Sequence, residues 1–280
     1  VHDFLTMKLT GRASASWTSA DPFGIFDIRR KEWSKPILDA LNIDEAKLPT
    51  LHRPGSAIGM VSGEAAAATG LRVGTPVFAA GGDGHCAALG VSAISPGIVY
   101  LNLGTAVVGG MWSATPQISR FWRTLVSPTG EGYLLESCQR AGAYFVNWLL
   151  DTFAGGRADA SIFARMEKEA SRLPIGSEGV MVCSYLLGCM DPHWDENARA
   201  TFTGMGATTG MRHLYRASLE AISLEFARAL EQMRSMGLQP DRILAIGGGA
   251  GSRLWRKMLA DSTGLPVVSA IPKSRCSTPQ

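Results

Sequence analysis

The sequence lacks any long apolar segment. None of its hydrophobic runs reaches the roughly 18 residues needed to cross a bilayer, and its first residues lack the apolar core of a signal peptide. It has five cysteines, but no CxxC pair and no Cys/His spacing typical of a metal site, and an odd number of cysteines cannot all pair within one chain. These absences predict a soluble, cytoplasmic protein with reduced thiols and no metal bound by its side chains.

Charged residues are scarce as well. They make up 18% of the 280 residues, and the 27 basic side chains are scattered along the chain, with a formal net charge of +3. Nucleic-acid-binding proteins generally gather basic side chains into a patch or stripe, so we expect small-molecule partners, with no nucleic acid and no membrane. A hydrophobic content of 46% over this length is enough for a substantial core, most simply divided between two domains.

Both ends of the chain look interrupted. The segment HDFLTMKLTG at residues 2–11 predicts a helix that the chain enters almost at once, and residues 277–280 follow without a closing element. We therefore expect a partial chain, from which part of an active site is missing. Residues 13–60 are rich in turn formers around Trp17 and Trp33, and we expect them to form surface connections.

One local pattern occurs twice, with a strand, a glycine turn and a helix in succession. Thr75–Ala80 predicts a short buried strand, the turn Gly81–Gly84 contains Asp83, and the following HCAALGV has helical spacing. Later, Arg242–Ile246 predicts a strand, Gly247–Ser252 forms a glycine loop, and RLWRKMLADSTG predicts a helix. The chain therefore contains two related strand-to-helix junctions.

Between these junctions lies a hairpin pattern. Ile98–Leu103 predicts a strand that turns at Gly104–Thr105 and returns as Ala106–Trp112, and Gly132–Ser137 predicts a third strand beside it. Further predicted elements are a helix around residues 144–149, a strand at 180–183 and an amphipathic helix from about 208 to 236. The order from residue 98 onward is βββαβαβα, which favours the α/β class.

Asp83 is the first candidate for chemistry. Its flanking glycines leave room for a ligand to approach, and ligands of open α/β sheets gather where strands end. As a general base, its carboxylate could take a proton from a substrate hydroxyl. Asp is also a favoured helix N-cap, so Asp83 on its own fits simple capping of the helix near His85 slightly better.

Two glycine turns are candidates for binding phosphate. The Gly104–Thr105 turn presents backbone N–H groups and one hydroxyl, although taken by itself it fits an ordinary hairpin turn better. The loop Gly247–Ser252 is more specific, because close helix–strand packing explains one glycine but hardly three in a row. It is neither a GxxxxGK(S/T) loop nor a GxGxxG fingerprint, and no acidic residue ends the next strand at Val267–Val268.

Taken together, these segments resemble the FGGY family of carbohydrate kinases. The resemblance runs through nearly the whole chain, and its most specific stretch is GGGAGSRLWRKMLADSTGLPVV. The other matching stretches are HDFLTMKLTG with FGIFDIRRKEWS, GTPVFAAGGDGHCAALG, LNLGTAVV, PHWDENARATFTGM and RHLYRASLEAISLEFARALEQM. The resemblance implies an actin-like ATPase fold of duplicated, ribonuclease H-like domains, with the first domain incomplete.

The resemblance also implies that sugar and nucleotide are bound by different domains. Residues 1–93 would be the C-terminal part of the first, sugar-binding domain, and residues 94–280 the second, nucleotide-binding domain with a truncated C-terminus. Asp83 would be the catalytic base and would contact the sugar together with Gly84. The residues expected to contact ATP are Gly104, Thr105, Gly142, Gly248, Gly249 and Ser252. The cofactors implied are ATP and Mg²⁺, and the oligomeric state is left open, a homodimer among the alternatives.

Two departures from the family pattern bear on activity. Gly188–Pro192 reads GCMDP where the family usually has Gly-Glu-Arg-x-Pro, and Ala106 stands where a second small hydroxyl usually follows the Gly-Thr pair. The first domain's opening phosphate hairpin is absent from this sequence, so we do not expect the chain alone to be a competent kinase.

The leading hypothesis is ATP-dependent phosphorylation of a ketose or polyol, with xylulokinase-like substrates preferred. A non-catalytic sugar- or nucleotide-sensing protein of the same fold and, more distantly, an NAD-dependent oxidoreductase are the alternatives.

Overall fold

The computed structural model describes residues 1–157 and 161–270, and the chain divides into two compact units. Unit 1 comprises Val1–Ile94, Trp112–Gln117 and Thr124–Leu135. Unit 2 comprises Ser95–Met111, Ile118–Arg123 and Glu136–Gln280. Over the described ranges, no helix is both long and apolar enough to cross a membrane.

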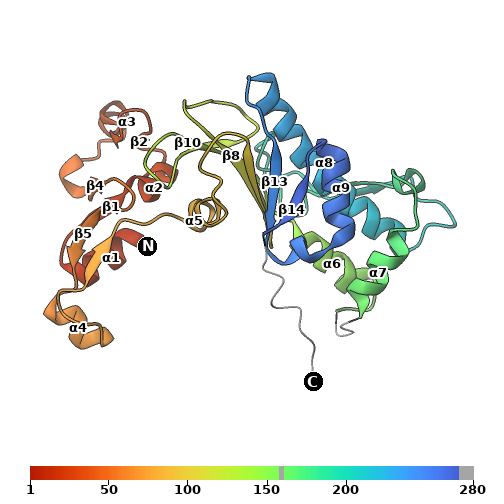
Figure 1. Ribbon diagram of the computed structural model, residues 1–280, viewed down its shortest axis with the longest axis horizontal. Helices are drawn as coiled ribbons and strands as arrows, with labels where there is room; N and C mark the ends of the chain where they lie inside the picture. The colour runs from red at the N-terminus through yellow and green to blue at the C-terminus, as the bar shows by residue number, and fades with distance from the viewer. Residues whose placement is uncertain (158–160, 271–280) are drawn as a thin grey trace. The chain divides into compact units, whose positions relative to one another are not determined.

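The segment Val1–Ile94 of unit 1 is built from short helices and two-stranded sheets (Figure 1). Its elements are α1 (His2–Thr10), β1 (Ser14–Ser16), α2 (Trp17–Ala20), η1 (Asp21–Phe23), β2 (Phe26–Asp27), β3 (Glu32–Trp33), α3 (Lys35–Ala40), η2 (Glu45–Lys47), β4 (Thr50–His52), β5 (Ala57–Met60), α4 (Gly63–Thr69), β6 (Pro76–Phe78) and α5 (Asp83–Gly90). Strands β1 and β4 pair in parallel, whereas β2–β3 and β5–β6 pair antiparallel.

The helix ends in unit 1 follow local sequence signals. The hydroxyl of Ser62 accepts the backbone N–H of Ala65 and caps the start of α4, and Gly70, with φ of +78°, ends it. In the same way, α1 ends at Gly11, which has φ of +73°. The helices expected at residues 2–11 and after Ser62 are therefore confirmed.

Residues 13–60 are not the surface connections that the sequence suggested. Phe26 and Trp33 pack edge to face, with ring centroids 6.2 Å apart, and form a buried cluster with Ala20, Leu38 and Val126. The turn-rich composition reflects very short strands and helices, whose side chains still meet in a core. The prediction failed because burial here depends on residues far apart in the sequence, Val126 included.

The strand expected at Thr75–Ala80 is present but is not buried. Only Pro76–Phe78 form β6, which pairs with β5 in an isolated two-stranded sheet, and Phe78 is 55% exposed. An apolar run of a few residues predicts a strand but not the layers that cover it. Asp83 therefore follows a partly exposed strand, and it is the first residue of α5.

Unit 2 contains most of a six-stranded sheet with order β14-β13-β7-β8-β10-β9. Its strands are β7 (Ile98–Leu103), β8 (Val107–Ser113), β9 (Arg123–Val126), β10 (Tyr133–Gln139), β13 (Arg242–Ile246) and β14 (Val267–Ser269). The remaining elements are α6 (Ala143–Phe153), α7 (Ile162–Ala170), η3 (Ser177–Gly179), β11 (Met181–Cys183), β12 (Thr201–Thr203), α8 (Met211–Ser235), η4 (Gly248–Gly251) and α9 (Arg253–Thr263).

Strand β7 lies inside this sheet and organises it. It pairs in parallel with β13 and antiparallel with β8. Four of its six residues, Val99, Tyr100, Leu101 and Leu103, are buried, which agrees with an apolar strand covered on both faces. Because β7 and β13 are parallel, the turns that follow Leu103 and Ile246 emerge at the same edge of the sheet.

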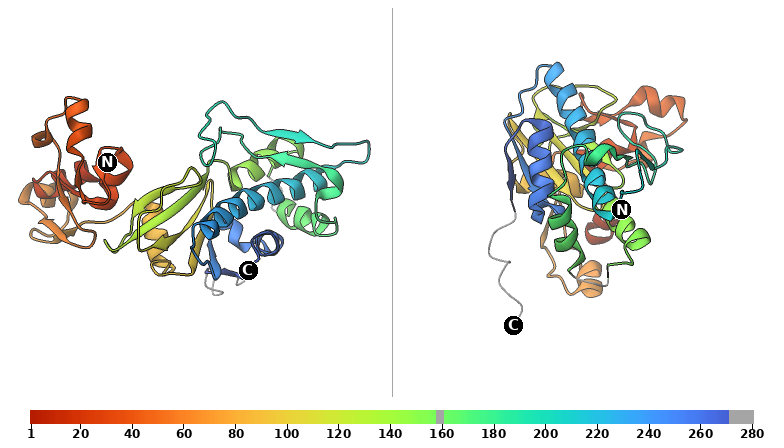
Figure 2. Two further views of the ribbon diagram at one scale, coloured as in Figure 1. Left: turned by 90° about the horizontal axis from the view of Figure 1, so that it is seen from above. Right: turned by 90° about the vertical axis from the view of Figure 1, so that its right-hand side faces the viewer.

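The helices of unit 2 bury regular apolar stripes. In α8, the buried residues Tyr215, Leu219, Ile222, Phe226 and Met233 recur at helical spacing. Helix α9 lies beside α8 next to β13 and β14 (Figure 1), and α8 also runs along the small sheet of β11 and β12 (Figure 2). The α/β class predicted from the sequence is confirmed. After residue 94, the strands and α-helices that the sequence did not predict are β9, α7 and β12; within residues 13–60 it predicted none of the short elements.

Candidate functional site

Asp83 presents an exposed carboxylate at the start of α5 in unit 1. Gly82 is the N-cap, and Asp83 is the first helical residue, where a negative charge interacts favourably with the helix dipole. Its Oδ1 accepts the N–H of Gly84 at 2.9 Å. A capping aspartate would accept an N–H two or three residues further on, so the geometry does not match simple N-capping.

In unit 2, the hairpin tip and the start of α6 are joined by backbone hydrogen bonds. The N–H groups of Gly142 and Ala143 donate to the carbonyls of Thr105 and Gly104, both at 2.9 Å. The N–H of Tyr144 also donates to the Thr105 carbonyl, at 3.2 Å. Three of the predicted nucleotide-contacting residues, Gly104, Thr105 and Gly142, are thereby brought together.

The glycine loop Gly247–Ser252 lies against the end of β7. A Cβ added to Gly249 would lie 2.9 Å from Leu103 Cβ, and one added to Gly247 would lie 2.4 Å from Asn102 Oδ1. The loop therefore packs directly on the residues that lead into Gly104. All six predicted nucleotide contacts fall in three segments that converge at this edge of the unit 2 sheet.

The three consecutive glycines are not equivalent. Gly247 has φ of +79°, which favours glycine, and Gly249 would clash with Leu103 and with the Trp255 ring if it carried a side chain. Gly248 is exposed, and a Cβ there would meet nothing within 4 Å. Backbone conformation explains Gly247 and packing explains Gly249, whereas the sequence suggested a structural reason for only one of the three glycines. Neither conformation nor packing requires a glycine at position 248.

Packing also explains Gly142. A Cβ at this position would lie 2.5 Å from the Val107 side chain and 2.8 Å from its backbone nitrogen. Gly104 is less constrained, because its nearest contact would be Asn102 Oδ1 at 3.3 Å. Asn102 was not among the predicted site residues. Its polar side chain within the otherwise apolar strand IVYLNL is a sequence signal that could have identified it.

Glu167 of α7 was also missed. Its Oε1 accepts the hydroxyl proton of Ser252 at 3.0 Å and the N–H of Leu254 at 2.7 Å, at the start of α9. A pocket of about 540 Å³ flanks this helix start and is lined by Glu167 and Gly251 together with the basic side chains of Lys168, Arg253 and Lys257. The pocket adjoins the predicted nucleotide loop. No signal in the sequence connects Glu167 with Ser252, since they belong to separate helices.

The segment Gly188–Pro192 is held by Asp191. Its carboxylate accepts the hydroxyl of Ser137 at 2.5 Å and the N–H of Cys138 at 2.7 Å. Burial raises the pKa of Asp191, and these two hydrogen bonds oppose that effect. The segment that departs from the family pattern is therefore tied to β10 by hydrogen bonds.

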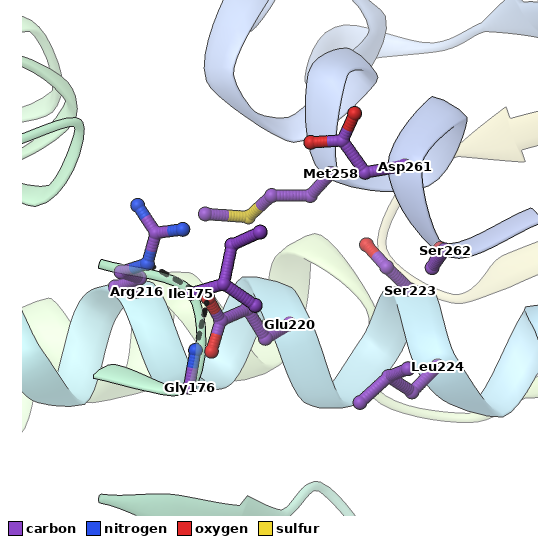
Figure 3. A pocket seen from close by; sticks show the side chains of 9 residues that line it. All are labelled: Ile175, Gly176, Arg216, Glu220, Ser223, Leu224, Met258, Asp261 and Ser262. Atoms are coloured by element: carbon purple, nitrogen blue, oxygen red, sulfur yellow. Dashed lines mark hydrogen bonds and ion pairs between the residues drawn. The ribbon is translucent and has the colours of Figure 1, made fainter. Parts of the chain in front are cut away.

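A second pocket of unit 2 lies apart from these residues. It has a volume of about 320 Å³ and lies between α8 and α9, next to the turn at Ile175–Gly176 (Figure 3). An ion pair forms one wall, with Nε of the buried Arg216 2.7 Å from Oε1 of the partly exposed Glu220. None of the predicted site residues lines this pocket. Across residues 1–157 and 161–270, no group of three or more His, Cys, Asp or Glu side chains could hold a metal ion.

Comparison with known proteins shows which class of protein has this fold. The structure of xylulose kinase from Rhodospirillum rubrum matches with a TM-score of 0.85 at 30% identity, covering 95% of this chain and 54% of that chain. The structure of gluconate kinase from Lactobacillus acidophilus matches with a TM-score of 0.86 at 26% identity, with the same coverage. The fold is therefore the α/β, actin-like ATPase fold of sugar kinases, as predicted.

The family follows from the sequence match. The C-terminal domain of the FGGY family of carbohydrate kinases matches residues 99–277, and the N-terminal domain of that family matches residues 1–90. Xylulose kinase from Lactococcus lactis is 31% identical over 264 residues, and that from Bacillus subtilis is 28% identical over 263 residues. The chain belongs to the FGGY family of carbohydrate kinases. Both matches cover 92% of this chain, but only 51% of the Lactococcus lactis protein and 52% of the Bacillus subtilis protein. The chain therefore spans about half the length of these relatives.

Proposed function

We propose that the complete protein carrying this sequence transfers the γ-phosphoryl group of ATP to a hydroxyl of a small ketose or polyol. The observation that carries the proposal is the convergence of Gly104–Thr105, Gly142 and Gly248–Gly249 at one edge of the unit 2 sheet. Gly248 has open space where a side chain would stand, which suits close approach of a ligand to the backbone. The similarity to proteins named xylulose kinase supports a pentulose as the acceptor.

The proposal divides the chain between the two substrates. Residues 1–93 belong to the sugar-binding domain and residues 94–280 to the nucleotide-binding domain. Asp83 and Gly84 contact the sugar, and Gly104, Thr105, Gly142, Gly248, Gly249 and Ser252 contact the nucleotide. A glycerol kinase from Plasmodium falciparum whose structure contains ADP has the same fold, with a TM-score of 0.82.

Asp83 acts as the general base in this proposal. Its exposed carboxylate accepts the proton of the substrate hydroxyl while the hydroxyl oxygen bonds to the γ-phosphorus of ATP. The bond between that phosphorus and the bridging oxygen breaks, and ADP leaves. The hydrogen bond from Gly84 N–H to Oδ1 orients the carboxylate, and Oδ2 remains for the substrate.

Magnesium fits this arrangement only as a companion of the nucleotide. The described residues offer no group of three or more His, Cys, Asp or Glu side chains that could hold a metal ion, so the phosphates of the nucleotide would be its main ligands. Mg²⁺ typically keeps several waters and binds to substrate phosphates with one or two carboxylates, and it would neutralise phosphate charge here.

The sheet topology bears on one of the two alternatives. The NAD interpretation requires a mostly parallel sheet, whereas β7 pairs antiparallel with β8 next to the glycine loop. The sensing interpretation, which began from the altered segment Gly188–Pro192, stays an alternative that measurement of turnover decides.

A coupled ADP-release screen against pentuloses, polyols and sugar acids tests the proposal in the complete protein. We expect sugar-dependent ADP release that Asp83→Asn reduces by about 10²-fold or more, because a general base contributes on the order of 10²–10⁴ in rate. ATP binding should stay nearly unchanged. Asp39→Asn, which alters an exposed aspartate in α3 of the same unit, is the matched control and should retain turnover. Full activity of Asp83→Asn contradicts the assigned base, and binding of sugar and ATP without turnover in the wild type supports a sensor.

A further inference from the structure

A buried histidine lies beneath the bend that carries Asp83. His85, two residues further along α5, is 4% exposed, and its Nε2 lies 3.6 Å from Oδ2 of Asp21 in η1. The Asp21 side chain is fully buried. The two residues belong to separate elements of unit 1, and only the fold brings them together.

The side chain of His85 lies next to the glycine bend itself. A Cβ added to Gly81 would lie 2.8 Å from the Cβ of His85, and one added to Gly82 would lie 3.4 Å from its Nδ1. The residue before the bend is also held, because the hydroxyl of Thr18 donates to the carbonyl of Ala80 at 2.7 Å. His85 therefore lies close to the backbone on either side of Gly82, and Asp83 follows directly.

Asp21 is fixed independently of His85. Its Oδ2 accepts the N–H of Val126 at 2.7 Å. Its negative charge also reaches Lys31, where it opposes the larger effect of burial, which lowers the pKa of that lysine. A buried carboxylate is stable only with such partners, so Asp21 is an anchored charge next to the first turn of α5.

His85 turns a polar edge towards this anchor. Its Nε2 makes no hydrogen bond with any described residue, and 3.6 Å is longer than a hydrogen bond, so the contact with Asp21 is electrostatic. Both the imidazolium and the neutral ring protonated on Nε2 direct an N–H towards the carboxylate. The Nε2 edge of the ring therefore faces Asp21, and its Nδ1 lies next to Gly82.

We propose that His85 is a positioning residue, which is held by Asp21 and fixes the direction of the Asp83 carboxylate through the glycine bend. This inference rests on the proposed function, because it requires Asp83 to be the base. Small misplacements of a catalytic group are costly, since a shift of about 1 Å can lower a rate by about 10²-fold. A histidine that served only as part of the core would affect stability and leave the chemistry of the folded protein unchanged.

The test compares substitutions of His85 in the complete protein. We expect His85→Leu to lower kcat by about 10- to 100-fold per folded molecule and to change the KM for ATP by less than about twofold. His85→Gln places an amide N–H near the position of Nε2 and should recover kcat to within about fivefold. His85→Asn places its amide near Nδ1 instead and should recover less. Equal kcat for the Gln and Asn variants contradicts the proposal. If His85→Leu does not fold, the comparison of the Gln and Asn variants still tests the positioning role of His85.

His213 provides a matched control in unit 2. It is 2% exposed, and its Nε2 lies 3.2 Å from Glu178 Oε2, so it too is a buried histidine next to a carboxylate. His213→Leu should lower the melting temperature without changing kcat per folded molecule. A loss of kcat equal to that of His85→Leu would show that any buried histidine has this effect, which overturns the proposal.

A double-mutant cycle separates positioning from a general loss of structure. In the Asp83→Asn background, His85→Leu should change the residual rate by less than about twofold, because no base remains to be positioned. The same fractional loss in both backgrounds contradicts the inference. If Asp83→Asn retains full turnover, the proposed function fails. If Asp83→Asn is inactive while His85→Leu keeps its full kcat, only the role of His85 fails.

Discussion

The carboxylate of Glu167 lies 3.0 Å from the hydroxyl of Ser252 and joins α7 to the start of α9. Ser252 donates its hydroxyl proton to Glu167 and accepts the N–H of Trp255 at 3.0 Å, so it serves as the N-cap of α9. Its hydroxyl therefore has no proton left to donate to a nucleotide. A contact between Ser252 and ATP, which remains a proposal, would use the second lone pair of its oxygen or the backbone.

Removal of this cap should destabilise the protein. We expect Ser252→Ala to lower the free energy of unfolding by about 1–2 kcal/mol, because α9 loses its N-cap and Glu167 loses a donor. Ser62→Ala removes the cap of α4, which lacks a carboxylate partner, and should cost about 1 kcal/mol or less. Urea denaturation of both variants measures the difference. An unchanged stability for Ser252→Ala contradicts its role as the N-cap.

The two neighbouring glycines of the loop should respond in opposite ways to alanine. Gly249→Ala places a methyl group 2.7 Å from the Trp255 ring and should lower the free energy of unfolding by about 1–3 kcal/mol. Gly248→Ala enters open space and should leave stability within about 0.5 kcal/mol while it raises the KM for ATP. Urea denaturation and ATP titration of the complete protein check both. An unchanged KM for Gly248→Ala contradicts the approach of the nucleotide to this residue.

A buried tyrosine supports the ionised network at the sheet. The hydroxyl of Tyr100 donates to Glu136 at 2.7 Å, and Glu136, which is 2% exposed, also pairs with Arg123. We expect Tyr100→Phe to lower the free energy of unfolding by about 2 kcal/mol, since a buried carboxylate loses a charge-assisted hydrogen bond. Tyr144→Phe, on the exposed face of α6, should stay within about 0.5 kcal/mol. Equal stabilities of the two variants in urea contradict this account.

Alkaline pH should destabilise unit 2 through Tyr215. Burial raises the pKa of Tyr215 to about 12, with a smaller contribution from the negative charge of Glu167. Since the folded pKa lies above the unfolded value near 10, the folded state favours the neutral phenol. Its contribution to stability is complete below about pH 10 and disappears as the pH rises through 12, a change of about 2–3 kcal/mol.

Urea denaturation between pH 9 and pH 11.5 measures this effect. The free energy of unfolding of Tyr215→Phe should fall less steeply with pH than that of the wild type. Tyr144→Phe is the control, because its side chain is exposed, and it should follow the wild-type slope. Parallel slopes for all three proteins contradict a raised pKa at Tyr215.

Local signals predicted the elements that carry the proposed site. The strands β7 and β13 have the predicted bounds, and the glycine loop and α9 follow β13 as expected. Apolar runs, capping serines and the glycines that end helices all act on residues a few positions away in the chain. Their effects can therefore be predicted from the local sequence. The short strands β9 and β12 escaped prediction, whereas the equally short β6 and β11 were predicted from their apolar runs.

The sequence by itself determined the α/β class, the family and the residues to which family roles can be proposed, because these depend on local patterns in a fixed order. Only the tertiary structure decided that Phe26 and Trp33 are buried, that Gly249 is needed for packing while Gly248 is not, and that His85 faces Asp21. The physical reason is that burial, steric exclusion and electrostatic pairing act through space, between residues whose separation along the chain carries no information about their distance.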